Sequence, residues 1–183
     1  MQKLLKQVGV DPAVAAHNAN RALVATSLRA LGVTFELVSR YSPELRSELA
    51  DWEEGRVLSM GVLPDGPAMS IEKTGGRVRF LGMGLREPTV AMLFKNMASA
   101  VMTFTGQIGA HTASIQRRVI VHGNITAAMQ GMRALSIVQK FLLPTLLLNR
   151  TSKNPVRLSG AELLIKARVM AGLGPLLIKT LAR

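Results

Sequence analysis

The feature that most constrains the fold is a change of hydrophobic period near residue 57. Apolar residues recur at helical spacing over residues 12–54, whereas they alternate with polar or small residues over residues 57–94. Alternation with a period of two is typical of a strand with one buried face. Turn sequences at 64–67 and 74–76 separate the alternating runs. The sequence therefore predicts an α+β domain in which four strands follow one another in a single meander.

Helices are expected before these strands. The first starts at Asp11-Pro12, where Asp caps free N–H groups and Pro suits the first turn, and it is expected to end at Gly32. The second starts at Ser42-Pro43 and is expected to stop at Gly55.

Further helices and one more strand are expected after the meander. They are a short helix from Asn96 to Gly106, a second over 110–116, a strand over 119–121, a long helix from Asn124 to Pro144, and a last helix that a Ser159–Glu162 capping box opens and that 172–175 breaks. Residues 149–155 have the composition of a linker.

Charge is distributed unevenly along the chain. Residues 1–87 hold eleven Lys or Arg against ten acids, whereas residues 88–183 hold twelve against Glu162 alone. Such asymmetry indicates an anionic partner for the second half, either nucleic acid or a surface of lipid headgroups.

The aromatic content bears on the choice between these partners. Proteins that read single strands usually stack bases on aromatic side chains, yet the chain has seven aromatic residues, and Tyr41 and Trp52 fall in the neutral half. The basic residues stand singly within apolar segments, which favours a membrane surface, where long basic side chains reach headgroups and apolar ones enter the interface. A nucleic-acid module remains the alternative.

Catalysis is poorly supported by the sequence. Without cysteine there is no thiolate chemistry, and neither His17, His111 nor His122 has an acid at metal-ligand spacing. Gly82-Met83-Gly84 lacks the third glycine and the helix of a dinucleotide loop. We therefore expect no enzyme activity, no cofactor and no metal.

The same features bear on location. The absence of cysteine fits a reducing compartment, the N-terminus lacks the apolar run of a signal peptide, and the uncharged stretch 96–116 is too polar to span a membrane. We expect a soluble, cytoplasmic protein, and the basic half allows a peripheral place at the inner face of a membrane.

Residues 57–143 resemble the sterol-binding domain of the sterol carrier protein family, type two. The order of expected elements matches at 89–95, 96–106, 109–116, 117–124 and 125–142, and the most suggestive motif is Gln-Arg-Arg-Val-Ile-Val-His-Gly-Asn at 116–124. Asn124 stands where the family usually has Asp, and residues 145–183 are additional.

The resemblance implies a five-stranded, mostly antiparallel sheet with helices over one face and an apolar tunnel. Family members bind sterols, fatty acids, acyl-CoA esters or phospholipids without changing them chemically, and a bacterial branch assists ubiquinone biosynthesis. On this basis residues 1–144 are the lipid-binding domain, with its core at 57–143 and its N-terminal helices at 11–54. Residues 145–183 are a linker and a basic, apolar helical arm.

The expected function is binding, with transfer or presentation of a hydrophobic ligand; an accessory scaffold for ubiquinone-biosynthesis enzymes is an alternative. Expected partners are a lipid, an anionic membrane surface and lipid-biosynthesis enzymes, with no nucleic acid. The inward residues expected to line the cavity are Leu58, Met60, Met69, Ile71, Phe80, Met92, Phe94, Met97, Val101, Phe104, Val119, Val121, Met129, Met132 and Leu135. An ordinary close-packed core made of the same residues is the competing interpretation. The arm would act as a lid or touch the membrane through Leu164, Lys166, Arg168 and Lys179.

Overall fold

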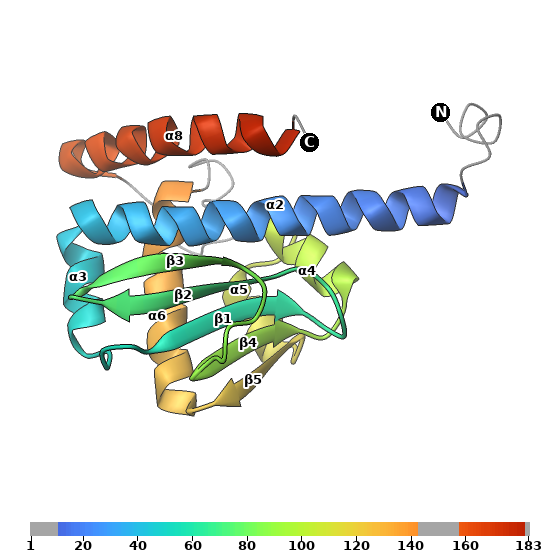
Figure 1. Ribbon diagram of the computed structural model, residues 1–183, viewed down its shortest axis with the longest axis horizontal. Coiled ribbons are helices and arrows are strands. Elements are labelled where there is room, and N and C mark those ends of the chain that lie inside the picture. The colour runs from blue at the N-terminus through green and yellow to red at the C-terminus, as the bar shows by residue number, and fades with distance from the viewer. Residues whose placement is uncertain (1–10, 143–157, 182–183) are drawn as a thin grey trace.

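The computed structural model describes residues 11–142 and 158–181, and the side chains up to residue 174. It contains one five-stranded sheet and six helices within these residues (Figure 1). The strands are β1 (Val57–Val62), β2 (Ala68–Thr74), β3 (Arg77–Met83), β4 (Val90–Phe94) and β5 (Val119–Gly123). The helices are α2 (Pro12–Tyr41), α3 (Pro43–Ala50), α4 (Met97–Phe104), α5 (Ala110–Ile115), α6 (Ile125–Leu142) and α8 (Gly160–Leu181).

The strand order is β3-β2-β1-β4-β5. β1 and β4 pair in parallel and every other neighbouring pair is antiparallel. The expected five-stranded, mostly antiparallel sheet is therefore confirmed, as is the α+β class.

The expectation of four strands in one meander was wrong, because β4 does not follow on from β3 at the edge of the sheet. Residues 84–89 carry the chain back across the sheet to the free side of β1. Ser70 holds this segment: its hydroxyl donates to the carbonyl of Gly84 at 2.8 Å and accepts from the amide of Arg86 at 3.1 Å. The alternating pattern is the same for a meander and for this crossover, so the pattern alone did not distinguish them.

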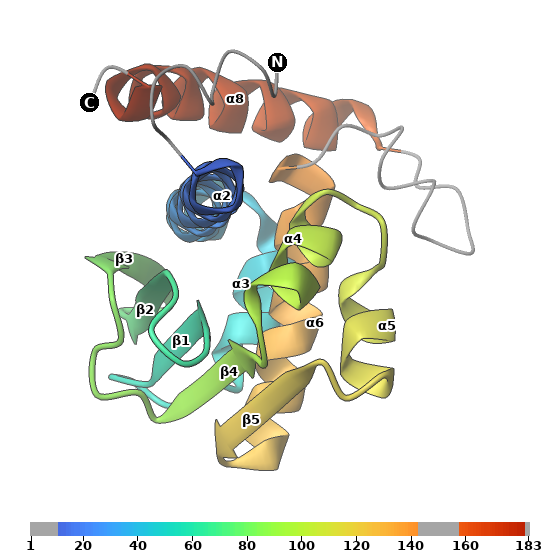
Figure 2. The ribbon, with the colours of Figure 1, turned by 90° about the vertical axis from the view of Figure 1, so that its right-hand side faces the viewer.

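Helices α2 and α6 lie on one face of the sheet, with α4 and α5 beside them (Figure 2). The second half of α2 supplies a large part of the core, since Val24, Leu28, Phe35 and Val38 are fully buried. Among the described residues, α2 is the one helix long and apolar enough to cross a membrane by length and composition. Burial against the sheet accounts for the apolar character of the second half of α2, whereas most of residues 12–23 are exposed.

Two glycines that were expected to end or break helices lie inside them instead. α2 continues past Gly32 to Tyr41, and α8 continues past Gly172 to Leu181. A Cβ at Gly32 would overlap the ring of Phe80, and one at Gly172 would lie 2.9 Å from Cδ1 of Leu37. Both glycines therefore serve close packing of the helix against a neighbour, and not helix termination.

The other helix boundaries agree in part with expectation. α3 ends at Ala50, one turn before Gly55. The Asp11, Ser42, Asn96 and Asn124 side chains accept amide hydrogen bonds at the expected helix starts. Pro144 and the linker at 149–155 lie outside the described residues.

We predict that Gly123→Ala destabilises the protein by about 2 kcal/mol or more, because Gly123 has a φ of +96° and a Cβ there would overlap the carbonyl of Thr89. Gly160→Ala is the control, since nothing lies within 4 Å of its Cβ position; it should change stability by less than about 1 kcal/mol. Urea unfolding measures both. Equal midpoints for the two variants would contradict the prediction.

Candidate apolar ligand site

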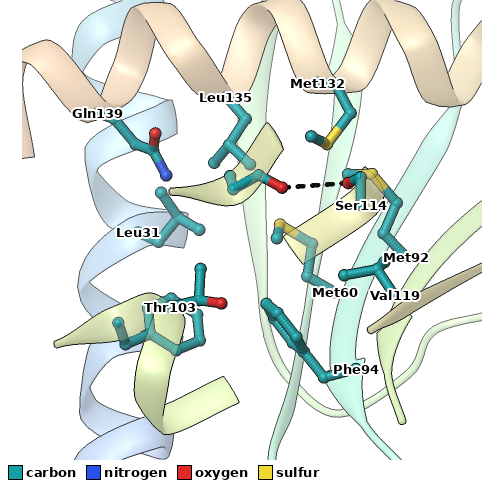
Figure 3. A pocket seen from close by; sticks show the side chains of 12 residues that line it. Leu31, Met60, Met92, Phe94, Thr103, Ser114, Val119, Met132, Leu135 and Gln139 are labelled. Carbon is teal, nitrogen blue, oxygen red and sulfur yellow. Dashed lines mark hydrogen bonds between the residues drawn. The ribbon is translucent and has the colours of Figure 1, made fainter. Parts of the chain in front are cut away.

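A small apolar cavity lies between the helical layer and the sheet. Its walls come from α2, α4, α5, α6 and the strands β1, β4 and β5 (Figure 3). Seven of the fifteen expected lining residues meet there: Met60, Met92, Phe94, Phe104, Val119, Met132 and Leu135. These residues come from five elements far apart in the sequence.

The pairing of β1, β4 and β5 explains how the strand residues come together. Met60 lies opposite Met92, and Phe94 lies opposite Val119. Because paired residues project to the same side of a sheet, these four side chains form one surface under the helices. The rings of Phe94 and Phe104 then pack with centroids 5.8 Å apart, which joins α4 to this surface.

Six expected residues are in the close-packed core and do not line the cavity. Leu58, Met69 and Ile71 are fully buried, and Phe80, Met97 and Val101 are partly buried against the same core. Phe80 meets α2 at Gly32, and Leu58 lies where a Cβ at Gly131 of α6 would be 2.8 Å from its Cδ1. The close-packed interpretation therefore describes these positions.

Val121 and Met129 also do not line the cavity, although the pattern puts them on its side. Val121 is opposite the buried Met92, and Met129 is one turn before Met132, yet both are exposed. Here the helical layer does not cover the end of the sheet. The expectation that these two side chains are enclosed was wrong.

Five lining residues were missed by the sequence analysis: Leu31, Thr103, Ala110, Ser114 and Gln139. Gln139 completes a helical stripe with Met132 and Leu135, at spacings of three and four residues, and this spacing was a usable signal. Gln139 was not predicted because its side chain is polar and the expected lining was apolar. No pattern marked Ala110 and Ser114, which lie on a helix of only six residues.

The cavity is small and almost filled by its own lining side chains. Its free volume is only about 20 Å³, which is space for about one water molecule. No charged side chain lines it. The hydroxyls of Thr103 and Ser114 donate to the carbonyls of Ser99 and Ala110 at 2.9 and 3.1 Å, so both are satisfied within their helices.

A separate, open polar groove of about 700 Å³ lies between α3, α5 and α6. Two of its three carboxylates are paired: Glu48 with Arg133 at 3.0 Å and Glu44 with Lys140 at 2.8 Å. Ser136 lies 3.5 Å from Nε2 of His111 but donates to the carbonyl of Met132 at 3.0 Å.

The groove brings carboxylates near His111 but does not join them to it. Within residues 11–142, no carboxylate hydrogen-bonds His111, and the described part of the chain holds no cluster of three or more acids or histidines suited to a metal. Ser136 and His111 therefore have no carboxylate among the described residues that would orient the imidazole as a base.

The arm helix α8 packs on α2 and on the end of α6. Its capping box is formed as expected, since the Ser159 amide donates to the Glu162 carboxylate at 2.7 Å and the Glu162 amide donates to the Ser159 hydroxyl at 3.3 Å. Hydrogen bonds from the Ser159 amide, and then from its side chain, to the carboxylate lower the pKa of Glu162, so their contribution is present at neutral pH and is lost as the pH falls through that lowered value.

The four residues expected to contact a membrane have different surroundings. Lys166 donates to the carbonyl of Lys140 at 3.2 Å, and burial lowers its pKa. The guanidinium of Arg168 lies over the ring of Tyr41, 5.4 Å from its centroid. Leu164 is exposed, and the side chain of Lys179 lies outside the described residues.

The arm does not cover the cavity as described. Lys166 and Arg168 hold α8 to the domain, and none of the described residues of α8 lines the cavity. The lid role therefore has no support in this arrangement.

Several solved structures resemble this chain. One is a conserved hypothetical protein of Thermus thermophilus described as possibly a sterol carrier protein (TM-score 0.46, 18% identity, covering 69% of this chain and 89% of that one). Another is a UbiJ-SCP2 ubiquinone synthesis protein (0.42, 16%, 63% and 96%). A third is the sterol carrier protein domain 2 of Helicoverpa armigera (0.40, 16%, 60% and 85%). The likeness is one of fold.

No protein-family model matches the chain, and no curated protein matches it.

We predict that Val169→Asp releases α8, because Val169 is fully buried in the contact of α8 with the domain and an unpaired charge there is costly. Met170→Asp, on the exposed side of the same helix, is the control and should leave α8 in place. Hydrogen exchange should rise along α8 in the first variant and not in the second. Loss of protection throughout the sheet would contradict the view that the arm is an addition to the domain.

Proposed function

We propose that this protein binds the apolar chain of a lipid in the cavity between α6 and the sheet, and transfers or presents it without chemical change. The observation that supports this is a buried apolar gap whose walls include three methionines, Met60, Met92 and Met132. Methionine side chains are unbranched and adapt to irregular apolar shapes. The gap is therefore the collapsed form of a site that opens as these side chains turn aside.

Opening requires that the ligand offset the cost of repacking. Burial of an acyl chain gains about 0.8 kcal/mol for each CH₂ group removed from water. Overpacking a well-filled core typically costs about 1–3 kcal/mol, so a chain of several CH₂ groups is sufficient in principle. A ligand with only a short apolar part does not gain enough free energy to offset this cost.

The walls also restrict the chemistry of the ligand. Because no charged side chain lines the cavity, a buried carboxylate or phosphate would have no counter-charge and would be strongly disfavoured. The enclosed part of the ligand is then uncharged, and any charged headgroup stays at the surface. Fatty acids, acyl-CoA esters, phospholipids, sterol-like molecules and isoprenoid quinone intermediates all meet this condition.

A role in presenting greasy intermediates to biosynthetic enzymes is the second form of the same proposal. It rests on the sequence resemblance, whose bacterial branch assists ubiquinone biosynthesis, and it shares the cavity. A cytoplasmic location beside a membrane fits both forms.

The nucleic-acid alternative is weakened by the pairing of basic residues. Arg133 and Lys140 are neutralised by Glu48 and Glu44. Fewer cations are then free for phosphates than the sequence count suggests.

Ala110→Phe should lower the affinity for a fluorescent fatty acid by at least about tenfold, because the added ring fills the cavity that Ala110 lines. Ala167→Phe on the exposed side of α8 adds the same ring away from the cavity and is the control. Fluorescence titration measures both, and native mass spectrometry of the wild-type protein should find co-purified lipid.

A wild-type protein that carries no lipid and binds no fluorescent fatty acid would remove the proposed function. Equal affinities of the two phenylalanine variants would indicate that the ligand binds outside this cavity. Circular dichroism checks that Ala110→Phe is folded; if it is not, Ser114→Leu, on the next turn of α5, replaces it.

A further inference from the structure

Four large apolar side chains are exposed close together in the sequence, at the end of α5, in β5 and at the start of α6. Their exposed fractions are 82% for Ile115, 42% for Val121, 75% for Ile125 and 57% for Met129. We call these four residues the apolar rim. α6 packs on β5, so Val121, Ile125 and Met129 lie on neighbouring elements, and exposed apolar side chains that share one surface mark contact sites more often than scattered single ones do.

The apolar rim continues the wall of the cavity. Val119 lines the cavity and Val121 projects from the same side of β5, two residues further on. Met132 lines the cavity, and Met129 and Ile125 lie three and seven residues before it, on the same stripe of α6. Apolar side chains therefore continue from the cavity lining to the exposed surface, as is expected at an entrance to an apolar site.

The charge around the apolar rim is positive on one side. Residues 88–142 contain five Lys or Arg and no acid. Arg117 and Lys95 are exposed, and both lie near the start of β5, where the Lys95 amide donates to the carbonyl of Arg118 at 2.9 Å. Among the described residues neither side chain has an ion pair.

Acids do occur near the other side of the apolar rim. Glu87 precedes β4, near the far end of β5, and Glu48 of α3 is paired with Arg133. The cationic side is thus the one that holds Arg117 and Lys95.

We propose that the apolar rim docks on an anionic lipid bilayer, with Arg117 and Lys95 at the headgroups, and that the ligand chain enters the cavity there. Exposed apolar side chains insert into the interface of a bilayer, and basic side chains beside them are attracted to anionic headgroups. The entry step rests on the proposed function, whereas docking does not.

This surface differs from the one expected on the arm. Figure 2 shows α8 at one end of the molecule and β5 with the start of α6 at the opposite end. A flat bilayer against the apolar rim leaves Leu163 and Leu164 of α8 on the far side. The two surfaces can therefore be tested against each other.

The first test compares two double variants by flotation with vesicles of phosphatidylcholine mixed with phosphatidylserine. Ile125→Glu with Met129→Glu should reduce binding by more than about tenfold, because it removes apolar contact and adds repulsion. Leu163→Glu with Leu164→Glu makes the same chemical change at similarly exposed positions of α8 and should bind as the wild type does.

The second test concerns charge. Arg117→Gln should weaken binding to the anionic vesicles by about fivefold and leave binding to pure phosphatidylcholine vesicles unchanged. Arg77→Gln is the control, because Arg77 is exposed on β3, at the opposite edge of the sheet.

A wild-type protein that does not float with anionic vesicles, a rim variant that floats like the wild type, or a loss caused by the α8 variant would each overturn the proposal. The flotation result does not depend on the cavity. If the protein binds no fatty acid but still binds vesicles through the apolar rim, the proposed lipid-binding function is disproved and the proposed docking surface is supported. If both hold, the rim double variant should keep its affinity for the fluorescent fatty acid in vesicle-free buffer within about twofold, because its side chains lie outside the cavity. The same variant should take up the fatty acid from vesicles more slowly.

Discussion

The parallel pairing of β1 with β4 is the constraint on which the rest of the site depends. It sets Met60 beside Met92 and makes β4 the strand on which β5 forms. From β5 the chain turns directly into α6, which returns over the sheet and contributes Met132 and Leu135. Had β4 paired with β3 instead, as a meander requires, the strand side of the cavity would lie apart from β1. The short segment held by Ser70 is therefore what makes an enclosed apolar space possible.

Local pattern was enough to predict the elements but not their pairing. Alternation and capping residues predicted five strands and most helix starts, because those signals act within a few residues. Strand order depends on which strands meet after a loop, and the alternation in β4 is compatible with either neighbour. Seven of the expected residues line the cavity, whereas Leu58 and Ile71 lie on the same side of their strands but are enclosed in the close-packed core.

Two kinds of expectation were wrong: the role of glycines within helices, and the burial of side chains on the inward face of an element. Gly32 and Gly172 have the same local signal as a helix end, but each allows a close approach to a residue that is distant in the sequence, Phe80 and Leu37 respectively. Val121 and Met129 have the same periodicity as their buried neighbours, yet no described element covers them. Periodicity identifies the face of an element, and only the tertiary arrangement determines whether that face is covered.

A nearly filled cavity beside an open apolar rim has a consequence for the proposed function. Part of the free energy of burying a chain is used to move Met60, Met92 and Met132, so the net affinity is lower than the buried area alone would give. A carrier benefits from this, because a ligand held with the full transfer energy would leave slowly. Docking of the apolar rim on a bilayer would shorten the path of the chain through water, which is the step with the highest cost for an apolar ligand. Moderate affinity in the cavity and an entrance at the membrane thus support exchange together, whereas tight storage would require a preformed, larger space.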